Sequence, residues 1–308
     1  MSKIKLGLVG VGKIARDQHL PLLADHAEFE LVATASRNAS IDGLTSYRSL
    51  AELLDREPDI RAISLCTPPG VRERDARLAL ERGVHVLLEK PPAASLGAAR
   101  DLLARAERSI LVASWHSRHA PAVEAARHWL ATRQLSKVDI AWREDIRTWH
   151  PNQDWILEPG GMGVFDPGIN ALSILTSLIP EAMVLESAEL AIPSNRQAPL
   201  AAELSLTTRS GVPIHAAFDF LQTGAQTWDM RLLAGDEELL LSEGGARMAV
   251  DGVQHSIEAA THHEYRGVYA NFADCLRRSA HDVDLRPLEI VADAFMLGKR
   301  KTLAAFSF

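Results

Sequence analysis

The first third of the chain alternates short apolar runs with stretches of helical periodicity. Five runs show almost no polar alternation, which is typical of strands buried on both faces of a parallel sheet. They cover residues 5–9, 31–35, 62–66, 85–88 and 110–113. Helical stretches lie between them, including 49–56 and 71–82, and Gly83 stands where a glycine commonly ends a helix. This order predicts an α/β domain in which helices wrap a parallel sheet.

The pattern changes after about residue 114. A helix over 121–132, a strand over 137–143 and a long loop rich in tryptophan, glycine and proline are expected first. Strands with alternating apolar and polar positions follow at 201–207, 213–220, 227–233 and 238–241, with turns at 210–211, 235–236 and 251–252. The alternation predicts an antiparallel sheet with one open face, and two helices at 264–279 and 287–300 close the chain.

Composition and charge exclude several classes of protein. With 47% hydrophobic and 24% charged residues, the chain has the composition of a globular protein. Lys and Arg number 33 against 40 Asp and Glu, so the net charge of −7 would repel a nucleic-acid backbone. The longest basic cluster, residues 299–301, is expected in the last turn of the final helix, where cations are favoured. We therefore expect no nucleic-acid partner.

Cysteine content and the length of apolar runs indicate the compartment. Cys66 and Cys275 are too few for a disulfide framework and lack the paired spacing of a zinc site. The scattered histidines lack the spacing and the carboxylate partners of a metal site. No apolar stretch approaches the roughly 20 residues of a membrane span, and the basic start is not followed by the pattern of a signal peptide. We therefore expect a cytoplasmic protein that binds no metal ion and does not span a membrane.

A glycine-rich turn directly follows the first predicted strand. Residues 10–15 read Gly-Val-Gly-Lys-Ile-Ala and open a helix. Gly10 permits a tight turn, Gly12 lets a pyrophosphate approach the backbone, and the small Ala15 lets the helix pack on the strand. Strand, glycines and helix in this order predict a dinucleotide site. Its contacts are expected in this turn and at the following strand ends, from Gly10, Gly12, Lys13, Ile14, Ser36, Arg37, Cys66, Thr67, Pro68, Glu89 and Lys90.

The end of the second strand indicates which dinucleotide is bound. It reads Ser36-Arg37-Asn38 and offers no carboxylate to the adenosine ribose. Arg37 can pair with a 2′-phosphate and lie against adenine, so NADP is the expected cofactor. If Arg37 is instead an ordinary solvated loop residue, NAD use is possible.

Two domains follow from these patterns. At about 150 residues per domain, 308 residues correspond to roughly two. Residues 1–120 are expected to form an N-terminal Rossmann domain with a parallel sheet that binds NAD(P). Residues 121–308 are expected to form a substrate-binding α+β domain with an open antiparallel sheet, whose C-terminal helices pack back on the first domain.

Three motifs in this order resemble a known family. The glycine turn, then Thr67-Pro68-Pro69, then Glu89-Lys90-Pro91 and a sheet domain resemble the glucose-fructose oxidoreductase and inositol dehydrogenase family of NAD(P)-dependent sugar and polyol enzymes. The resemblance implies that Lys90 contacts substrate and is catalytic, and that a cis proline follows it. Residues 13–21, 142–151, 158–173 and 282–288 resemble, within this family, the bacterial dehydrogenases of L-arabinose and D-galactose.

The activity that this resemblance implies is NAD(P)-dependent oxidation of an aldopyranose at C1 to the aldonolactone. L-Arabinose, D-galactose or both are the expected substrates, with D-fucose as a further candidate, and NADP is preferred. One alternative is a non-catalytic regulator on the same fold that senses nucleotide and sugar. Another is a related polyol or dihydrodiol dehydrogenase.

The reaction needs a group that takes the O1 proton and polar groups that orient the ring. Asp166 and Asn170 are four residues apart at a predicted helix start, so they share one face. Lys90 and Asp166 are both candidates for the proton acceptor, and Asn170 would position O1 or the nicotinamide. Many family members carry His in place of Asn170, which argues against a simple Asp-His relay. In the alternative interpretation neither residue is catalytic: Asp166 caps the N-terminus of the helix, and Asn170 is an ordinary polar residue within it.

Sugar recognition is expected around the tryptophan-rich loop. Glu144, Trp149 and His150 combine a carboxylate, an aromatic face and an imidazole, a set that suits a pyranose. His116 and Trp228 are weaker candidates for the same pocket, whereas Trp129 and Trp142 are expected in the core. The open sheet face is expected to associate with a second copy of the chain.

Overall fold

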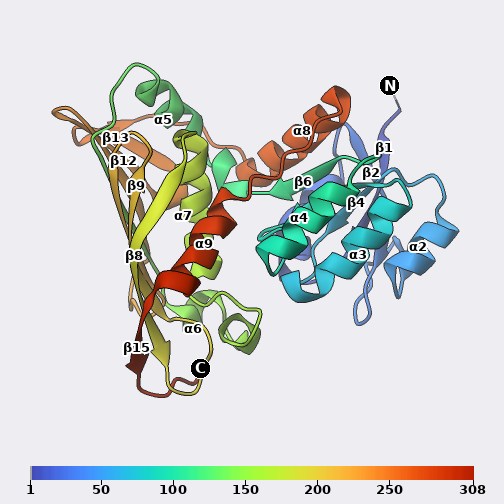
Figure 1. Ribbon diagram of the computed structural model, residues 1–308. Coiled ribbons are helices and arrows are strands. Elements are labelled where there is room, and N and C mark those ends of the chain that lie inside the picture. Colours follow the sequence, from blue (N-terminus) through green and yellow to red (C-terminus); the bar gives the residue numbers. More distant parts are fainter. Residues whose placement is uncertain (1) are drawn as a thin grey trace. The chain divides into compact units, whose positions relative to one another are not determined.

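The computed structural model describes residues 2–308, which divide into two units (Figure 1). Unit 1 is the chain up to His116 together with Glu264–Leu285. Unit 2 is Ser117–His263 together with Arg286–Phe308. The chain therefore passes from unit 1 to unit 2, returns, and ends in unit 2.

Parallel strands form the sheet of unit 1, as predicted. Within residues 2–308 it has six strands in the order β3-β2-β1-β4-β5-β6, and every neighbouring pair is parallel. This is the strand order of the dinucleotide-binding Rossmann fold, which confirms the predicted fold class. The strands are β1 (Ile4–Val9), β2 (Phe29–Ala35), β3 (Thr45–Tyr47), β4 (Ala62–Leu65), β5 (His85–Glu89) and β6 (Leu111–Ser114).

Helices connect these strands. Two of them begin at serine N-caps, because Ser49 Oγ accepts from Glu52 N and Ser95 Oγ accepts from Ala98 N. The third ends before Gly83, whose φ of 72° is the expected left-handed helix end. The helical segments of unit 1 are η1 (Ala15–His19, a π-type turn), α1 (Leu20–Leu23), α2 (Leu50–Arg56), α3 (Pro69–Glu81), α4 (Leu96–Arg105), η2 (His116–His119, which begins at the boundary) and α8 (His263–Arg278).

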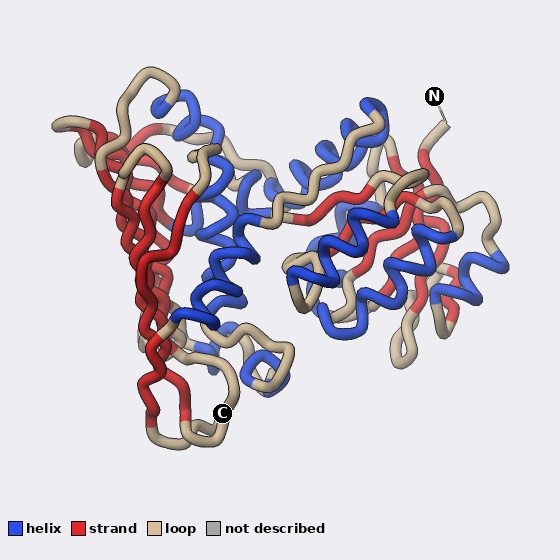
Figure 2. The backbone as a smooth tube through the Cα atoms, viewed as in Figure 1, coloured by secondary structure: helices blue, strands red, loops and turns tan. Residues whose placement is uncertain are grey.

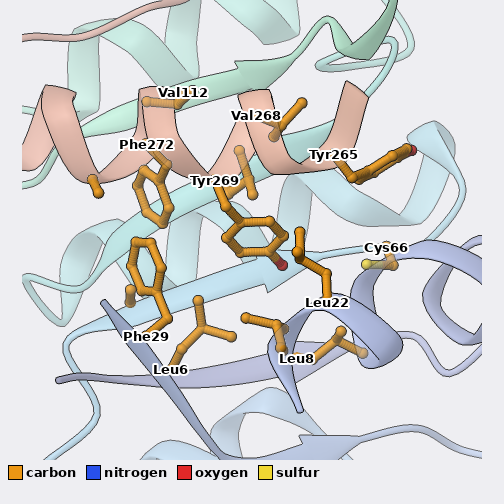
Figure 3. Packing of buried hydrophobic residues seen from close by; sticks show 14 of the residues in the cluster. Leu6, Leu8, Leu22, Phe29, Cys66, Val112, Tyr265, Val268, Tyr269 and Phe272 are labelled. Atoms are coloured by element: carbon orange, nitrogen blue, oxygen red, sulfur yellow. The ribbon is translucent and has the colours of Figure 1, made fainter. Parts of the chain in front are cut away.

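Helix α8 packs on the sheet of unit 1 although it follows unit 2 in sequence. Its buried residues include Tyr265, Tyr269 and Phe272, which recur at the spacing of one helix face. Figure 3 shows this face against side chains of β1 and β2, and the Phe272 ring stacks on Phe29 at 5.4 Å. Burial of this aromatic stripe fixes α8 to unit 1.

Unit 2 is built on a large mixed sheet. Among the described residues it has nine strands in the order β14-β13-β12-β11-β7-β10-β9-β8-β15. Most pairs are antiparallel, but β7 with β10 and β8 with β15 are parallel, which corrects the expectation of a purely antiparallel sheet. The strands are β7 (Lys137–Arg143), β8 (Met183–Pro193), β9 (Ala201–Thr208), β10 (Pro213–Asp219), β11 (Thr227–Ala234), β12 (Glu237–Ser242), β13 (Arg247–Val250), β14 (Val253–His255) and β15 (Lys299–Leu303).

The three predicted hairpin turns are confirmed. Gly211, Gly235 and Gly252 have φ values of 89°, 63° and 77°, which favour glycine over any residue with a Cβ. They connect β9 to β10, β11 to β12 and β13 to β14.

Helices cover one face of this sheet (Figure 2). Phe218 of β10 points to the covered face, because its ring lies 5.6 Å from Phe165 of α7 and a Cβ on Gly168 would come within 2.7 Å of it. Ala217, the residue before Phe218, therefore points to the other face. The helical segments of unit 2 are α5 (Val123–Leu130), α6 (Ile146–Trp149), η3 (Asp154–Leu157), α7 (Phe165–Leu178), η4 (Glu243–Gly245) and α9 (Arg286–Leu297).

The end of the chain differs from its prediction. Helix α9 stops at Leu297, and Lys299–Leu303 is a strand rather than the last turn of a helix. A Cβ on Gly298 would lie 2.4 Å from the carbonyl oxygen of Ala294, and the following residues find backbone partners along β8. Pairing of an otherwise open sheet edge thus outweighs continued helix formation.

Helix α9 also differs from the expectation that both closing helices pack on the first domain. It packs on α7 and β8 within unit 2.

No helix in the described part of the chain is both long and apolar enough to cross a membrane.

Candidate functional site

The glycine turn lies at the carboxyl end of β1, where ligands bind in open α/β sheets. Gly10 has a φ of 92°, and a Cβ there would come within 2.9 Å of Thr67. A Cβ on Gly12 would meet nothing within 4 Å, so the space beside Gly12 is open. Lys13 and Ile14 begin the helical segment that follows. The ammonium group of Lys13 pairs with the carboxylate of Asp17. This turn offers backbone N–H groups to an anion.

A cavity of about 490 Å³ adjoins the turn. Ser36, Arg37, Thr67 and Pro68, all predicted cofactor residues, line it together with Gly10. The Thr67 hydroxyl is buried and has no hydrogen-bond partner among the described residues. An orphaned hydroxyl beside a glycine turn fits the polar atoms of a dinucleotide.

Two further arginines line this cavity and were not predicted. Arg48 directly precedes the N-cap of α2, and Arg74 lies in α3, where it pairs with Asp75 at 3.2 Å. Neither forms a recognisable pattern with Arg37 in the sequence. Three arginines against one paired carboxylate make the cavity suitable for a group that carries more negative charge than a diphosphate alone.

Strand β5 ends in a buried carboxylate beneath the predicted catalytic lysine. Glu89 is 4% exposed, and its Oε1 accepts from Tyr265 at 2.9 Å, His19 at 3.0 Å and Ser114 at 3.1 Å. Its Oε2 accepts from the backbone N–H of Lys90 at 3.1 Å, and the peptide bond after Lys90 is cis, as the resemblance implied. The side chain of Glu89 is thus engaged by protein groups, and a direct contact with a cofactor stays a prediction.

Glu89 and His19 form a charged pair in the interior. Burial would raise the pKa of Glu89, but the hydrogen bond and charge of His19, with the charges of His116 and Arg72, lower it to about 2. Burial would lower the pKa of His19, but Cys66, Tyr269 and Glu89 outweigh burial and raise it well above its ordinary value. Both shifts favour the ion pair of a Glu89 carboxylate with a His19 imidazolium.

Arg72 joins the two loops that carry the predicted nucleotide and catalytic residues. Its Nε donates to the carbonyl of Thr67 at 2.9 Å, and its Nη1 donates to the carbonyls of Glu89 and Pro91. Its planar fork suits several carbonyl acceptors at once. Sequence reasoning assigned no role to Arg72 or His19, although His19 falls within residues 13–21, which supported the family resemblance.

The remaining unit 1 candidates have defined surroundings. Cys66 is buried, as predicted for a packing residue. His116 pairs with Glu264 and stacks on Tyr265, with ring centroids 5.4 Å apart.

Unit 2 brings four predicted substrate residues together. Trp149 lies 4.8 Å from Trp228 by ring centroids, and the indole N–H of Trp228 donates to Glu144 Oε2 at 2.9 Å. Glu144 Oε1 lies 3.2 Å from His150 Nε2 but forms no hydrogen bond to a described residue. Trp149 is 42% exposed, whereas Glu144 is 2% exposed. The exposed surface of this cluster therefore comes from the two indole rings and the imidazole. The buried Glu144 lies under them and contacts Trp228 and His150.

Trp142 and Trp129 are buried, which confirms their predicted place in the core. Trp142 stacks on Trp228 at 6.0 Å and supports the aromatic cluster. The sequence spacing of 84 residues between Glu144 and Trp228 explains why Trp228 was the weaker candidate: only the pairing of β7 with β11 brings them together.

Asp166 and Asn170 lie in the first turns of α7, so they share one helix face as predicted. Asp166 is 7% exposed and Asn170 is half-buried. The N-cap of α7 is Val164, so Asp166 is not the capping residue of the alternative interpretation. Two glycines shape the approach to α7, since a Cβ on Gly163 would lie 2.2 Å from the carbonyl oxygen of Pro199 and one on Gly161 would lie 2.3 Å from that of Ile156.

The chain resembles known proteins along its whole length. Residues 4–126 match the oxidoreductase family described by its NAD-binding Rossmann fold. A galactose 1-dehydrogenase from Pseudomonas fluorescens is 44% identical over 306 residues, which cover 99% of each chain. The crystal structure of a D-galactose-1-dehydrogenase from Rhizobium etli matches with a TM-score of 0.95 at 50% identity, over 100% of this chain and 99% of the other. A 3-ketoreductase from Actinomadura kijaniata in complex with NADP shares the fold, with a TM-score of 0.82 at 19% identity over 98% and 100% of the chains.

Proposed function

The chain belongs to the oxidoreductase family with an NAD-binding Rossmann fold, and from this premise we propose that it is an aldose 1-dehydrogenase. It oxidises D-galactose, L-arabinose or both at C1 to the aldonolactone, and D-fucose is a further substrate. The observation that carries the proposal is the full-length similarity, at 44% and 50% identity, to two galactose 1-dehydrogenases. The aromatic and imidazole cluster of unit 2 supports a pyranose as the substrate.

The chemistry requires that C1 loses a hydride and O1 loses a proton. A nicotinamide dinucleotide held by the glycine turn and the arginine-lined cavity would supply the hydride acceptor. Lys90 and Asp166 supply the proton acceptor, and Asn170 orients O1 or the nicotinamide ring. A carboxylate and an amine are both groups that can take a proton from a sugar hydroxyl, so either residue can fill this role.

Sugar recognition uses the cluster of Trp149, His150, Trp228 and Glu144. The indole faces suit the apolar C–H face of a pyranose, and the His150 imidazole suits a ring hydroxyl. L-Arabinose and D-galactose share their configuration at C2, C3 and C4 and differ at C5. A pocket that reads the first three positions and leaves room at C5 accepts both sugars.

NADP is the proposed cofactor, with NAD as the alternative. Arg37 and Arg48 line the nucleotide cavity, and the end of β2 offers no carboxylate to a ribose. A 2′-phosphate gains charge-assisted hydrogen bonds from these guanidinium groups.

Replacement of Arg37 by alanine is expected to raise KM for NADP+ by about tenfold or more, because a hydrogen bond to a charged group contributes about 1.5–3 kcal/mol. KM for NAD+, which lacks the phosphate, should change little. Arg82→Ala is the matched control, since Arg82 pairs with Asp55 and does not line the cavity. Equal effects of Arg37→Ala on both dinucleotides would contradict NADP preference.

The proposed activity is tested by initial rates at the absorbance of the reduced nicotinamide. L-Arabinose, D-galactose, D-glucose and myo-inositol are each supplied with NADP+ and with NAD+. We expect turnover of the first two sugars, faster with NADP+. Turnover of myo-inositol alone would identify a polyol dehydrogenase. Dinucleotide binding without turnover of any substrate would identify the non-catalytic regulator.

We further propose a homodimer formed through the uncovered face of the unit 2 sheet. Ala141 and Ala217 are paired neighbours on the central strands β7 and β10, and their small side chains let a second sheet approach closely. The protein should therefore sediment as a dimer at micromolar concentration. Ala217→Arg should yield monomers, because a long charged side chain on this face would keep a second sheet from packing against it. An unchanged sedimentation coefficient would argue against this interface. A cytoplasmic location fits an enzyme that consumes a nicotinamide dinucleotide.

A further inference from the structure

The last residues of the chain end on a buried aromatic anchor. Phe306 is 6% exposed, whereas Ala304, Ala305 and Ser307 around it are exposed. The backbone N–H of Phe306 donates to Asn195 Oδ1 at 2.9 Å, and Asn195 Nδ2 donates to the Phe306 carbonyl at 3.0 Å. Two hydrogen bonds to one amide side chain fix both the position and the direction of the tail. We call residues 304–308 the C-terminal tail.

Arg196 links the C-terminal tail to the loop that follows α6. Its side chain is 13% exposed, and its Nε donates to the Phe306 carbonyl at 3.3 Å. Its two terminal nitrogens bind Glu158 at 2.8 Å and Asp154 at 2.7 Å. One planar guanidinium thus joins the tail to both ends of η3.

Arg147 provides a second link, directly to α6. Its guanidinium carbon lies 4.8 Å from the centre of the Phe306 ring, a cation–π contact. Its backbone N–H donates to the capping carboxylate of Asp145 at 2.9 Å. In Figure 1 the C-terminus lies beside α6, as these contacts require.

Helix α6 needs such external support. It has four residues, and the backbone N–H groups of Trp149 and His150 donate to the carbonyls of Asp145 and Ile146 at 3.1 and 2.8 Å. A single helical turn is not stable on its own, because nucleation fixes several residues for few hydrogen bonds. Trp149 and His150 therefore keep their positions only as long as neighbouring segments hold α6.

We propose that Phe306, Asn195 and Arg196 are positioning residues for sugar binding: through the C-terminal tail they hold α6 so that Trp149 and His150 face the substrate. The inference rests on the proposed function and deepens it, since the tail then sets the affinity for the sugar while unit 1 binds the dinucleotide.

Removal of the anchor should separate these two affinities. Phe306→Ala is expected to raise KM for D-galactose by about tenfold, because a displaced binding group weakens every contact that it makes. The Kd for NADP+ and kcat at saturating sugar should stay within about twofold. Phe306→Tyr keeps the ring face for Arg147 and should restore KM. Ser307→Ala is the matched control, because it changes an exposed side chain of the same tail and leaves the Phe306 ring in contact with Arg147 and with Phe308, 5.5 Å away.

Hydrogen exchange of residues 146–158 gives a readout that does not depend on activity. These amides should exchange faster in Phe306→Ala than in the parent and in Ser307→Ala, and a chain that ends at Leu303 should behave like Phe306→Ala. Unchanged exchange, or an unchanged KM in an active enzyme, would overturn the role of the tail. A parent enzyme that is inactive on every sugar would instead overturn the proposed function.

Discussion

Lys90→Ala should lower kcat for D-galactose by about 10³-fold, the size of a lost general base at the centre of the reaction. The Kd for NADP+ should change far less than kcat, because Lys90 is one predicted cofactor contact among many and the glycine turn and the arginine-lined cavity are untouched. Dinucleotide binding is measured by fluorescence titration and kcat by initial rates. Lys5→Ala is the control, since Lys5 is a surface residue of the same unit that pairs with Asp59. An alanine variant with near-parental kcat would exclude Lys90 from the chemistry.

Two further variants divide the proton transfer between Lys90 and Asp166. Lys90→Arg keeps the positive charge but cannot accept a proton, because a guanidinium does not deprotonate in proteins. If Lys90 is the base, arginine should be as inactive as alanine; if Lys90 only orients O1, arginine should retain more activity. Asp166→Asn combined with Lys90→Ala should cost less than the sum of the single losses if the two residues act as a unit.

Removal of one partner from the buried Glu89–His19 pair should destabilise unit 1 by about 3–5 kcal/mol. Glu89→Ala leaves a buried imidazolium without its carboxylate, whereas the double variant His19→Gln/Glu89→Gln removes both charges, keeps an acceptor for Tyr265 and Ser114, and should recover a large part of the loss. Urea unfolding followed by hydrogen exchange of β1 and β5 reports on unit 1. Asp59→Asn, which breaks an exposed pair with Lys5, should change stability little. A double variant no more stable than Glu89→Ala would argue against a charged pair.

The same pair predicts how stability depends on pH. Glu89 titrates at about 2 in the folded protein against an ordinary value of 4.5, so the unfolded chain binds the proton more readily between these values. Its contribution is present above pH 4.5 and should fade as pH falls towards 2. The raised pKa of His19 acts in the opposite direction, so its contribution is lost only as pH rises through the folded value. The stability difference between the parent and the double variant should therefore shrink in acid.

Local signals in the sequence were sufficient for much of the fold. The turn at Gly10, the helix end at Gly83 and the hairpin glycines each depend on backbone conformations that few other residues adopt. Uninterrupted apolar runs identified the parallel strands, because such strands are buried on both faces. The family motifs added Lys90, Asp166 and Asn170 as candidates before any geometry was known.

The errors arose where a distant partner outweighed a local preference. Residues 299–301 follow a helix and carry the charges of a helix end, but β8 lies beside them and its open edge pairs with them. In the same way, β7 and β10 are parallel although the alternating pattern of the strands predicted an antiparallel sheet. Periodicity reports which face of a segment is buried, and it carries no information about the strand that will cover its edge.

By itself, then, the sequence determined the parallel sheet, the alternating strands of the second sheet and the nucleotide turn, because each depends on interactions within about a dozen positions. The candidate site residues came largely from the family resemblance. The tertiary structure alone decided that Glu89 meets His19 and Tyr265, that Arg48 joins Arg37 in one cavity, and that Phe306 anchors the loop of Trp149. These contacts join residues that lie from 11 to well over 100 positions apart in the chain. They form only in the folded protein, where buried polar groups must find hydrogen-bond partners.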